Sequence, residues 1–546
     1  MKIALAQLNY HIGNFEHNTA KIIEYITLAK ADGADLVVFA ELAVCGYPPR
    51  DFLEFEEFIS LCEDAALKVA EHCNGIACII GLPVRNEAAA GKDLFNAAYF
   101  IADGKVQAVA KKALLPNYDV FDEYRYFEPA TQFECIDYKG TRIALTICED
   151  LWNINNNPLY VSNPMDVLIT QGPDIMINIA ASPFSYQHDD ERMVVLAGNA
   201  KKYKLPLLYV NQVGAQTEII FDGGSMAFDS EGNLLDEMPY FKEHLRTYTL
   251  NGRTIEGYVK TPHVDVPDIA QIHDALIMGI KDYFNKSGFS KAVLGLSGGI
   301  DSAIVCALAC RALGPENVMA VLMPSKYSSD HSVKDALDLV ENFGCKHEII
   351  EIKAAAEAFD SMMAHAFQGL PFNLTEENIQ ARSRGIVVMA MSNKFGYILL
   401  NTSNKSECAV GYGTLYGDMC GAIGVIGDVY KTQIYELAHY INKDGEVIPE
   451  NTIVKPPSAE LRPGQKDSDS LPDYDTLDAI LYQFIELKKS SAAIIALGYD
   501  EALVRRIIKM VNAAEFKRYQ TPPILRVSPK AFGMGRRMPI VGKYLA

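Results

Sequence analysis

A short apolar run that ends in a serine and two glycines is the feature that most constrains the fold of this chain. The run, residues 292–296, is predicted to be a buried strand, and a helical pattern of apolar residues follows from residue 300. Ser297, Gly298 and Gly299 lie between them. This order of strand, glycine turn and helix points backbone N–H groups and the positive end of the helix at an anion. The segment therefore predicts a phosphate-binding loop, with a tight turn that binds nothing as the alternative.

Asp301 is an unusual residue for such a loop, because a carboxylate repels a phosphate unless a cation lies between them. We therefore expect Mg²⁺ at Asp301. The loop lacks the lysine of the P-loop and instead resembles the Ser-Gly-Gly-x-Asp-Ser loop of the ATP pyrophosphatases, which cleave ATP to AMP and pyrophosphate. That resemblance implies that ATP is a co-substrate. The residues it assigns to ATP are Gly295, Leu296, Ser297, Gly298, Gly299, Ile300, Asp301 and Ser302.

Length, charge and cysteine content exclude several classes of function. At 546 residues the chain is too long for one hydrophobic core, so two or more domains are expected. The formal net charge of -19 argues against binding to nucleic acid or to an anionic membrane surface, and no apolar run is long enough to span a bilayer. The 11 cysteines are scattered and show no paired metal spacing, which favours reduced thiols in the cytoplasm.

In residues 1–250, three polar residues each follow an apolar strand-like run: Glu41, Lys112 and Cys148. Strand-like runs alternate with helical patterns in this region, which predicts a layered α/β domain. Taken singly, the three residues have ordinary interpretations as a helix cap, a surface lysine and a small core residue. Taken together, they can act on an amide. The thiol can attack the carbonyl, the carboxylate can carry the thiol proton to the leaving ammonia, and the lysine can stabilise the oxyanion.

The segments around these residues resemble the nitrilase (carbon–nitrogen hydrolase) superfamily. The matching segments are Phe39-Ala40-Glu41-Leu42, Lys112-Ala113-Leu114-Leu115-Pro116 and Ile147-Cys148-Glu149-Asp150-Leu151-Trp152. The resemblance implies a four-layer α-β-β-α sandwich and a Glu-Lys-Cys triad, in which Glu123 orients the lysine and the substrate. For the glutaminase branch of the superfamily, it also implies glutamine contacts at Tyr118, Glu149, Ser182 and His188, the last at a position where relatives often carry a basic residue.

The rest of the sequence predicts a linker and a second α/β domain. Residues 251–269 are polar and contain two prolines, as expected for a linker. Strands and helices alternate again in residues 270–546, where about five parallel strands with covering helices predict a doubly wound sheet. Ligands of such a sheet bind at the carboxyl ends of its strands.

The polar loop at 401–407 follows one of these strands. Thr402 and Lys405 can hold phosphate there, and Glu407 offers a second oxygen ligand for the Mg²⁺ expected at Asp301. A helix cap rich in serine, threonine and asparagine is the alternative.

This second half closely resembles the NAD synthetase family. The segments that carry the resemblance are 297–302, 323–329, 377–382, 401–407, 416–419, 428–432 and 455–461, and segments 517–518 and 527–529 fit the glutamine-dependent branch. The resemblance implies that Thr402 contacts ATP and that Asp301 and Glu407 hold Mg²⁺. The residues that it assigns to the second substrate, deamido-NAD, are Asn378, Glu407 and Lys517.

Together the two resemblances imply an enzyme that makes NAD⁺ with glutamine as the nitrogen donor. A thioester on Cys148 would release ammonia, which would displace AMP from deamido-NAD that has been adenylated by ATP. Because ammonia is protonated in bulk water at pH 7, a buried tunnel is implied, and the family resemblance implies a homo-oligomer. The alternatives are another amidotransferase of the ATP-pyrophosphatase class, an amidase with a regulatory nucleotide-binding half, and a structural protein with two inactive sites.

Overall fold

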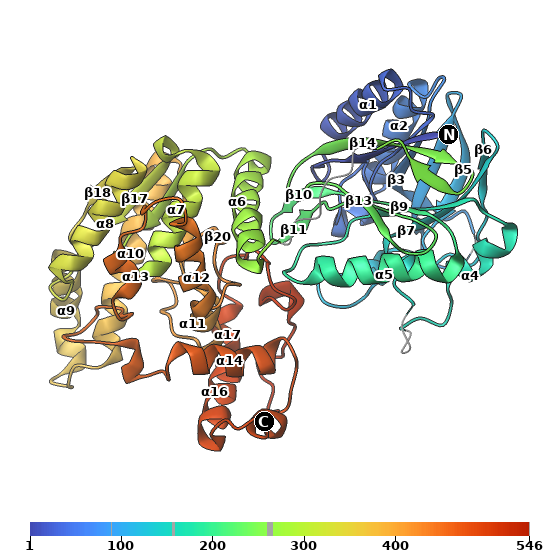
Figure 1. Ribbon diagram of the computed structural model, residues 1–546. Coiled ribbons are helices and arrows are strands. Elements are labelled where there is room, and N and C mark those ends of the chain that lie inside the picture. Colours follow the sequence, from blue (N-terminus) through green and yellow to red (C-terminus); the bar gives the residue numbers. More distant parts are fainter. Residues whose placement is uncertain (89, 155–158, 259–265, 545–546) are drawn as a thin grey trace. The chain divides into compact units, whose positions relative to one another are not determined.

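The structure, a computed structural model, describes residues 1–88, 90–154, 159–258 and 266–544. It divides into two compact units, Met1–Val266 and Pro267–Ala546 (Figure 1). Within the described ranges, every helix is too short or too polar to cross a membrane. Each unit has its own sheets and its own hydrophobic core.

Two large sheets form the middle of the first unit, in the orders β15-β14-β1-β2-β3-β4-β5 and β13-β12-β9-β8-β7-β6. A small hairpin pairs β10 with β11. The strands are β1 (Lys2–Gln7), β2 (Leu36–Val38), β3 (Ala77–Arg85), β4 (Leu94–Ala102), β5 (Lys105–Lys111), β6 (Ile136–Tyr138), β7 (Thr141–Ile147), β8 (Ile175–Ala180), β9 (Leu207–Asn211), β10 (Val213–Gln216), β11 (Ile219–Asp222), β12 (Met226–Phe228), β13 (Leu234–Glu237), β14 (His244–Asn251) and β15 (Thr254–Glu256). The helices are α1 (Phe15–Ala31), α2 (Glu56–Glu71), α3 (Glu123–Tyr126), α4 (Pro164–Leu168) and α5 (His188–Tyr203).

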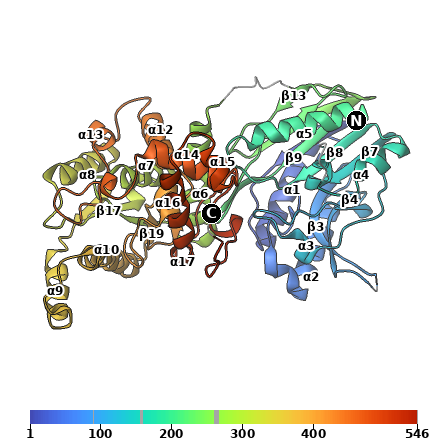
Figure 2. The same cartoon turned by 90° about the horizontal axis from the view of Figure 1, so that it is seen from below.

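The alternation of side chains along β1 shows how the layers form. Ile3 and Leu5 point into the core between the two sheets, where Ile177 of β8 also lies. Ala4 and Ala6, on the opposite face, belong to the core that α1 and α2 share with the first sheet. Helices α4 and α5 cover the outer face of the second sheet (Figure 2). The predicted four-layer α-β-β-α sandwich is confirmed.

Part of the expected linker at 251–269 belongs to this sandwich. The β15 strand pairs with β14, and its Ile255 is buried between the exposed Thr254 and Glu256. A single apolar residue gives a weak strand pattern, which is why the sequence favoured a linker here. Residues 259–265 lie outside the described residues, and α6 begins at Asp268.

Five parallel strands form the sheet of the second unit, in the order β18-β17-β16-β19-β20. They are β16 (Ala292–Gly295), β17 (Val318–Leu322), β18 (Lys346–Ile349), β19 (Ile398–Asn401) and β20 (Ile423–Gly424). The helices are α6 (Asp268–Ser287), α7 (Ile300–Leu313), α8 (Asp330–Phe343), α9 (Lys353–Phe367), α10 (Leu374–Phe395), α11 (Lys405–Val410), α12 (Lys431–Ile441), α13 (Glu450–Val454), α14 (Tyr474–Ile485), α15 (Ser491–Ile495), α16 (Glu501–Ala513) and α17 (Glu515–Arg518).

Helices cover both faces of this sheet. Val293, Val321 and Leu399 pack against Val388 of α10 on one face. Helix α7 packs against β16 and β17, and α6 and α12 pack against α7. The prediction of a doubly wound parallel sheet is confirmed.

The strand order reverses between β16 and β19, because β17 and β18 lie on one side of β16 while β19 and β20 lie on the other. Ligands of doubly wound sheets bind at such a reversal, at the carboxyl ends of the strands. The loop at 296–299 leaves β16 and the loop at 402–404 leaves β19. The fold therefore brings the two polar loops singled out in the sequence to the same edge of the sheet.

Candidate active sites

Cys148 stands immediately after β7, in the first position of a short 3₁₀ turn, Cys148–Leu151. Its φ of 45° lies in the left-handed region, which a residue with a side chain seldom adopts. Strain of this kind is found at functional sites, where the surrounding structure holds the residue in place. Cys148 is buried, and the turn fixes the direction of its thiol.

Asp150 joins the end of β5 to the end of β7. Its Oδ1 accepts hydrogen bonds from the backbone N–H groups of Ala113 (3.0 Å) and Leu114 (2.9 Å), and its Oδ2 accepts one from Ile147 (3.0 Å). Lys112 therefore enters the same pocket as Cys148. The sequence analysis did not single out Asp150.

Lys112 lies between two carboxylates. Its Nζ is 2.7 Å from Glu41 Oε1 and 2.8 Å from Glu123. Asn96, a polar residue within β4, donates a hydrogen bond to Glu41 Oε1 at 2.7 Å, and the Tyr47 hydroxyl donates one to Glu123 Oε1 at 2.9 Å. All five side chains are buried. The structure therefore brings Glu41, Lys112 and Glu123 into one hydrogen-bonded cluster, with two partners that the sequence analysis missed.

The charges of this cluster set the protonation of its members. Burial alone would lower the pKa of Lys112, but the charges of Glu123 and Glu41 raise it well above its usual value. Burial raises the pKa of Glu123 to about 7, although Lys112 opposes that shift. Burial and the charge of Glu41 raise the pKa of the Cys148 thiol well above its usual range. The thiol is therefore neutral near pH 7, and it needs a base to become a nucleophile.

Two tyrosines hold the carboxylate of Glu149 beside this cluster. The hydroxyls of Tyr118 and Tyr160 each donate to Glu149 Oε1 at 3.0 Å. Burial raises the pKa of Glu149 to about 7, against the opposing charge of Lys112 and these two hydrogen bonds. Tyr118 and Glu149 were expected from the sequence, whereas Tyr160 was not.

Ser182 and His188 also lie together. Ser182 Oγ is 3.2 Å from His188 Nε2, and the imidazole ring stacks on Trp152 with 5.2 Å between ring centroids. Asn211 fixes the Ser182 loop from both sides, because its Oδ1 accepts from Ser182 N (2.8 Å) and its Nδ2 donates to Ser182 O (3.1 Å). A polar ligand that reaches Ser182 therefore meets the imidazole as well.

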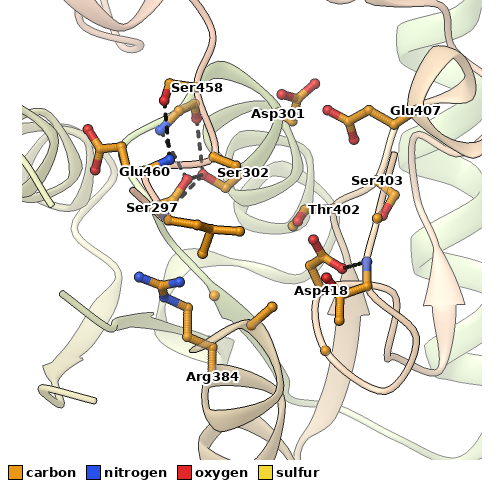
Figure 3. Close-up of a pocket in the computed structure, with 18 of the residues that line it drawn as sticks. Ser297, Asp301, Ser302, Arg384, Thr402, Ser403, Glu407, Asp418, Ser458 and Glu460 are labelled. Atoms are coloured by element: carbon orange, nitrogen blue, oxygen red, sulfur yellow. Dashed lines mark hydrogen bonds between the residues drawn. The ribbon is translucent and has the colours of Figure 1, made fainter. Parts of the chain in front are cut away.

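The second unit contains a cavity of about 790 Å³ at the sheet edge where the two polar loops meet (Figure 3). The candidate residues that line it are Gly295, Leu296, Ser297, Gly299, Ile300, Asp301, Ser302, Asn378, Thr402, Glu407 and Lys517. Gly298 does not line it. A Cβ at Gly298 would lie 2.1 Å from the backbone oxygen of Ser332, and its φ is +79°, so this glycine serves the turn and the close approach of α8.

Hydrogen bonds within the glycine loop hold it in a compact turn. Ser297 Oγ accepts from the backbone of Gly299 at 3.2 Å. Ser302 Oγ donates to the carbonyl of Gly299 at 3.0 Å and accepts from Ser297 N at 3.2 Å. The first turn of α7 thus faces the cavity with its N–H groups preset for an anion.

Asp301 and Glu407 lie side by side at this cavity (Figure 3). Asp301 Oδ1 accepts from Asn404 Nδ2 at 2.9 Å, and Asp301 Oδ2 pairs with the buried Lys431. Burial and the negative charge of Asp301 raise the pKa of Glu407 well above its usual value. Two carboxylates that repel one another in this way offer the oxygen donors that Mg²⁺ prefers, so the residues fit that ion.

The expectation that Lys405 holds phosphate is wrong. Its side chain is fully buried, and Nζ lies 2.9 Å from Asp428, 2.8 Å from Glu486 and 2.7 Å from Ser528 Oγ. As the first residue of α11, Lys405 points into the C-terminal helices instead of the cavity. Lys431, which was quoted from the sequence only within a matching segment, lines the cavity together with Lys455 and Lys517.

Asn378 and Lys517 occupy another part of the cavity wall. Asn378 Oδ1 accepts from the Thr414 hydroxyl at 2.8 Å. Lys517 Nζ donates to the carbonyls of Gly411 and Gly413, each at 2.8 Å. Both side chains are therefore held at the cavity wall by hydrogen bonds to the loop at 411–414.

Two family models match the chain in succession. The carbon–nitrogen hydrolase model matches residues 2–258, and the NAD synthase model matches residues 272–521. Both resemblances found in the sequence are confirmed.

Known proteins match over nearly the whole length. A glutamine-dependent NAD(+) synthetase from Synechocystis sp. is 46% identical over 547 residues, which cover 98% of this chain and 98% of that protein. One from Acinetobacter baylyi is 42% identical and covers 99% of this chain and 98% of its own length. The solved structure of a glutamine-dependent NAD⁺ synthetase from Acinetobacter baumannii, in complex with ADP, has a TM-score of 0.78 at 39% identity, covering 99% of this chain and 98% of that one. The chain therefore belongs to the glutamine-dependent NAD(+) synthetase family.

Proposed function

We propose that this chain hydrolyses glutamine in its first unit and uses the ammonia to make NAD⁺ from deamido-NAD and ATP in its second. The observation that carries the proposal is that one chain contains a neutral thiol beside a buried Glu41–Lys112–Glu123 cluster and a large cavity bordered by a preset anion-binding turn. A glutaminase needs only the thiol site and an ATP-dependent ligase needs only the cavity, whereas a glutamine-dependent synthetase needs both.

Glutamine hydrolysis begins with Cys148. Its Sγ attacks the amide carbonyl while Glu41 accepts the thiol proton and passes it to the leaving ammonia. Lys112, which the two carboxylates keep protonated, stabilises the oxyanion. Water then hydrolyses the thioester to glutamate. Glu123 keeps the ammonium of Lys112 in place, and Tyr47 and Asn96 hold the carboxylates.

The charges of free glutamine match the remaining groups of this pocket. The carboxylate of Glu149, held by Tyr118 and Tyr160, pairs with the α-ammonium group of glutamine. Ser182 and His188 donate hydrogen bonds to its α-carboxylate. The ammonium and the carboxylate of the substrate then contact different walls of the pocket, and the amide faces Cys148.

In the second unit, an oxygen of the nicotinate carboxylate attacks the α-phosphorus of ATP, and pyrophosphate leaves. Ammonia then attacks the carbonyl carbon of the adenylate, and AMP leaves. The N–H groups of the Ser297–Ser302 turn and the Thr402 hydroxyl hold the phosphates. Asn378 and Lys517 contact deamido-NAD.

Asp301 and Glu407 would hold Mg²⁺, which when bound would neutralise charge on the phosphates. Lys431 pairs with Asp301 and keeps a positive charge at the cavity wall beside these two carboxylates. Asn404 fixes the other oxygen of Asp301, so the orientation of that carboxylate is set by the protein.

Ammonia must reach the adenylate before it takes a proton from bulk water, so the proposal includes its direct passage to the synthetase site. It also includes a homo-oligomer and a location in the cytoplasm. Sedimentation of the purified chain measures whether it forms the oligomer. The fraction of ammonia that escapes into solution during turnover with glutamine tests the passage.

The experiment that tests the proposed function is NAD⁺ formation from deamido-NAD, ATP and Mg²⁺ by the wild type and by Cys148→Ala, each with glutamine or with ammonium. We expect the wild type to use both donors and Cys148→Ala to use ammonium alone. Cys135→Ala, which removes a partly exposed thiol of the same unit, is the matched control and should use both. If the wild type makes no NAD⁺ with either donor, the proposal is wrong. If Cys148→Ala still uses glutamine, the nucleophile is another residue.

A further inference from the structure

Three cysteines of the second unit lie close together although the sequence separates them. Cys306 and Cys310 are one helical turn apart on α7, on the same face, and Cys345 stands just before β18. Their sulfur atoms all lie within 4.8 Å of one another, and Cys306 Sγ is 4.0 Å from Cys345 Sγ. Catalysis as proposed above uses none of them. We call these three residues the thiol cluster.

The dimensions of the thiol cluster fit a three-coordinate ion. Three sulfurs placed about 2.3 Å from a central metal in one plane lie about 4.0 Å apart. The distance between Cys306 and Cys345 already has this value, and Cys310 needs a shift of less than one ångström.

The ligand set selects the kind of ion. Within the described residues, the cluster comprises three sulfurs and includes no fourth cysteine, histidine or carboxylate. Structural zinc sites use four protein ligands in a tetrahedron, whereas thiolate sulfur selects soft ions such as Cu⁺. We propose that the thiol cluster of Cys306, Cys310 and Cys345 is a binding site for one Cu⁺ ion.

The electrostatics of the cluster agree with this geometry. Hydrogen bonds from the thiols of Cys306 and Cys310 lower the pKa of Cys345. Binding forms three copper–sulfur bonds, the protons of the thiols that bind pass to the solvent, and the ion stays Cu⁺, so that no electron is transferred.

The position of the cluster gives the ion both an entry and an effect. Cys310 and Cys345 retain 4% and 6% of their exposure, while Cys306 has none, so the ion enters past the first two. Helix α7 carries Asp301 and Ser302 in its first turn, one turn before Cys306. A bound ion therefore ties the helix of the ATP loop to β18, the edge strand of the sheet. We expect it to raise the melting temperature of the second unit.

Competition with bicinchoninate, a chromophoric Cu⁺ chelator, tests the proposal on the full-length reduced chain without oxygen. We expect the wild type to take one equivalent of Cu⁺ from the chelator. Cys310→Ala and Cys345→Ala should not take this equivalent. Alanine suits these variants because a buried cysteine packs as a small apolar residue. Cys135→Ala is the control and should keep the equivalent. X-ray absorption of the bound copper should show three sulfurs at about 2.3 Å.

A second measurement needs no variant of the cluster. Bound Cu⁺ should protect Cys306, Cys310 and Cys345 of the wild type from alkylation, as read by peptide mass spectrometry after mild heating. The proposal is overturned if the wild type takes no Cu⁺ from the chelator or if Cys345→Ala keeps the equivalent. It is also overturned if copper protects other cysteines instead, or if Zn²⁺ occupies the cluster in preference to Cu⁺.

Discussion

The two candidate active sites differ in how their carboxylates are paired. In the first unit, Lys112 lies between Glu41 and Glu123, and further hydrogen bonds satisfy both carboxylates. This cluster is buried, and its lysine pairs with both carboxylates without any ligand. In the second unit, Asp301 keeps 20% of its side-chain exposure in a cavity of about 790 Å³, and Glu407 makes no ion pair within the described residues.

The difference teaches which parts of each reaction the protein supplies itself. In the mechanism that we propose, the first pocket carries its own base, Glu41, and its own oxyanion-stabilising cation, Lys112, so that its reaction needs only glutamine and water. The second pocket has the same kinds of charge as the first cluster, two carboxylates and one lysine, but Lys431 pairs with Asp301 alone and Glu407 has no ion pair within the described residues. Its ligands must complete the electrostatics. Removal of one charge should leave an unpaired partner in either site and should impair the chemistry of that site.

The largest effect is expected from Lys112→Met. Removing the cation leaves Glu41 and Glu123 buried together, which costs about 3–5 kcal/mol in the free energy of unfolding of the first unit. Glutamine-dependent NAD⁺ formation should fall by more than about 10³-fold, because the oxyanion loses its cation. Chemical denaturation and glutamate release measure the two effects. Lys111→Met, which removes the neighbouring and partly exposed lysine, is the matched control and should change neither by much.

Asp301→Asn should impair the chemistry of the second unit, and it also removes the carboxylate that pairs with the buried Lys431. We expect synthesis from saturating ammonium to fall about 10²–10³-fold, since the carboxylate beside the phosphates is lost. Glutamate release by the first unit should continue. Asp338→Asn, at a surface ion pair of the same unit, serves as the control. Normal synthesis from ammonium by the Asp301→Asn chain would show that this carboxylate is not part of the site.

The same contrast explains which residues the sequence made predictable. Glu41 and Lys112 follow strands of the first sheet, whereas Cys148 follows a strand of the second. Position after a strand therefore marked each residue, and the combined chemistry of the three, rather than one sheet edge, indicated that they act together. Their partners come from other places: Asn96 lies inside β4, and Tyr47 lies in a loop, where no periodic pattern marks it. A polar residue within an otherwise apolar strand was the available signal for Asn96.

In the second unit, the same rule identified the loop at 402–404 but not the direction of each side chain. Lys405 and Glu407 are two residues apart at the start of α11, so they leave the helix on different sides. Glu407 faces the cavity and Lys405 faces the C-terminal core. Lys431 belongs to α12, far along the chain from Glu407. A sequence pattern does not show how close two such residues lie in space. The fold was thus more predictable than the contacts.

The pH dependence of glutamine binding should reveal Glu149. Burial raises the pKa of Glu149 to about 7 in the folded chain. Its carboxylate, which we propose pairs with the substrate ammonium, therefore gains a proton as the pH falls below that value. The KM for glutamine should rise about tenfold between pH 8 and pH 6. Glutamate release measured over that range tests this, and Glu149→Gln should give a high KM without the slope.

The sign of the linked stability change follows from the same shift. A carboxyl group whose pKa is raised by folding binds its proton more tightly in the folded state. The stability that it contributes is full below the unfolded value near 4.5 and is lost as the pH rises through about 7. Glu149→Gln should remove this decline. A KM slope that persists in Glu149→Gln would place the titrating group elsewhere, with Glu123 as the next candidate because its pKa is also about 7.

The smallest effect is expected from Tyr160→Phe, which removes one hydrogen bond to Glu149 Oε1 while the Tyr118 hydroxyl still lies within hydrogen-bond distance of both carboxylate oxygens. The lost bond is worth about 1 kcal/mol, or about fivefold in the KM for glutamine, because Tyr118 still holds the carboxylate. The midpoint of the KM profile should also move to a higher pH, since the hydroxyl stabilises the charged form. Tyr118→Phe is the matched variant, and it should match Tyr160→Phe if both tyrosines only hold Glu149. A larger loss in Tyr118→Phe would show that this hydroxyl contacts glutamine as well. A double variant with a far greater loss than the two single variants combined would show that each tyrosine compensates for the other.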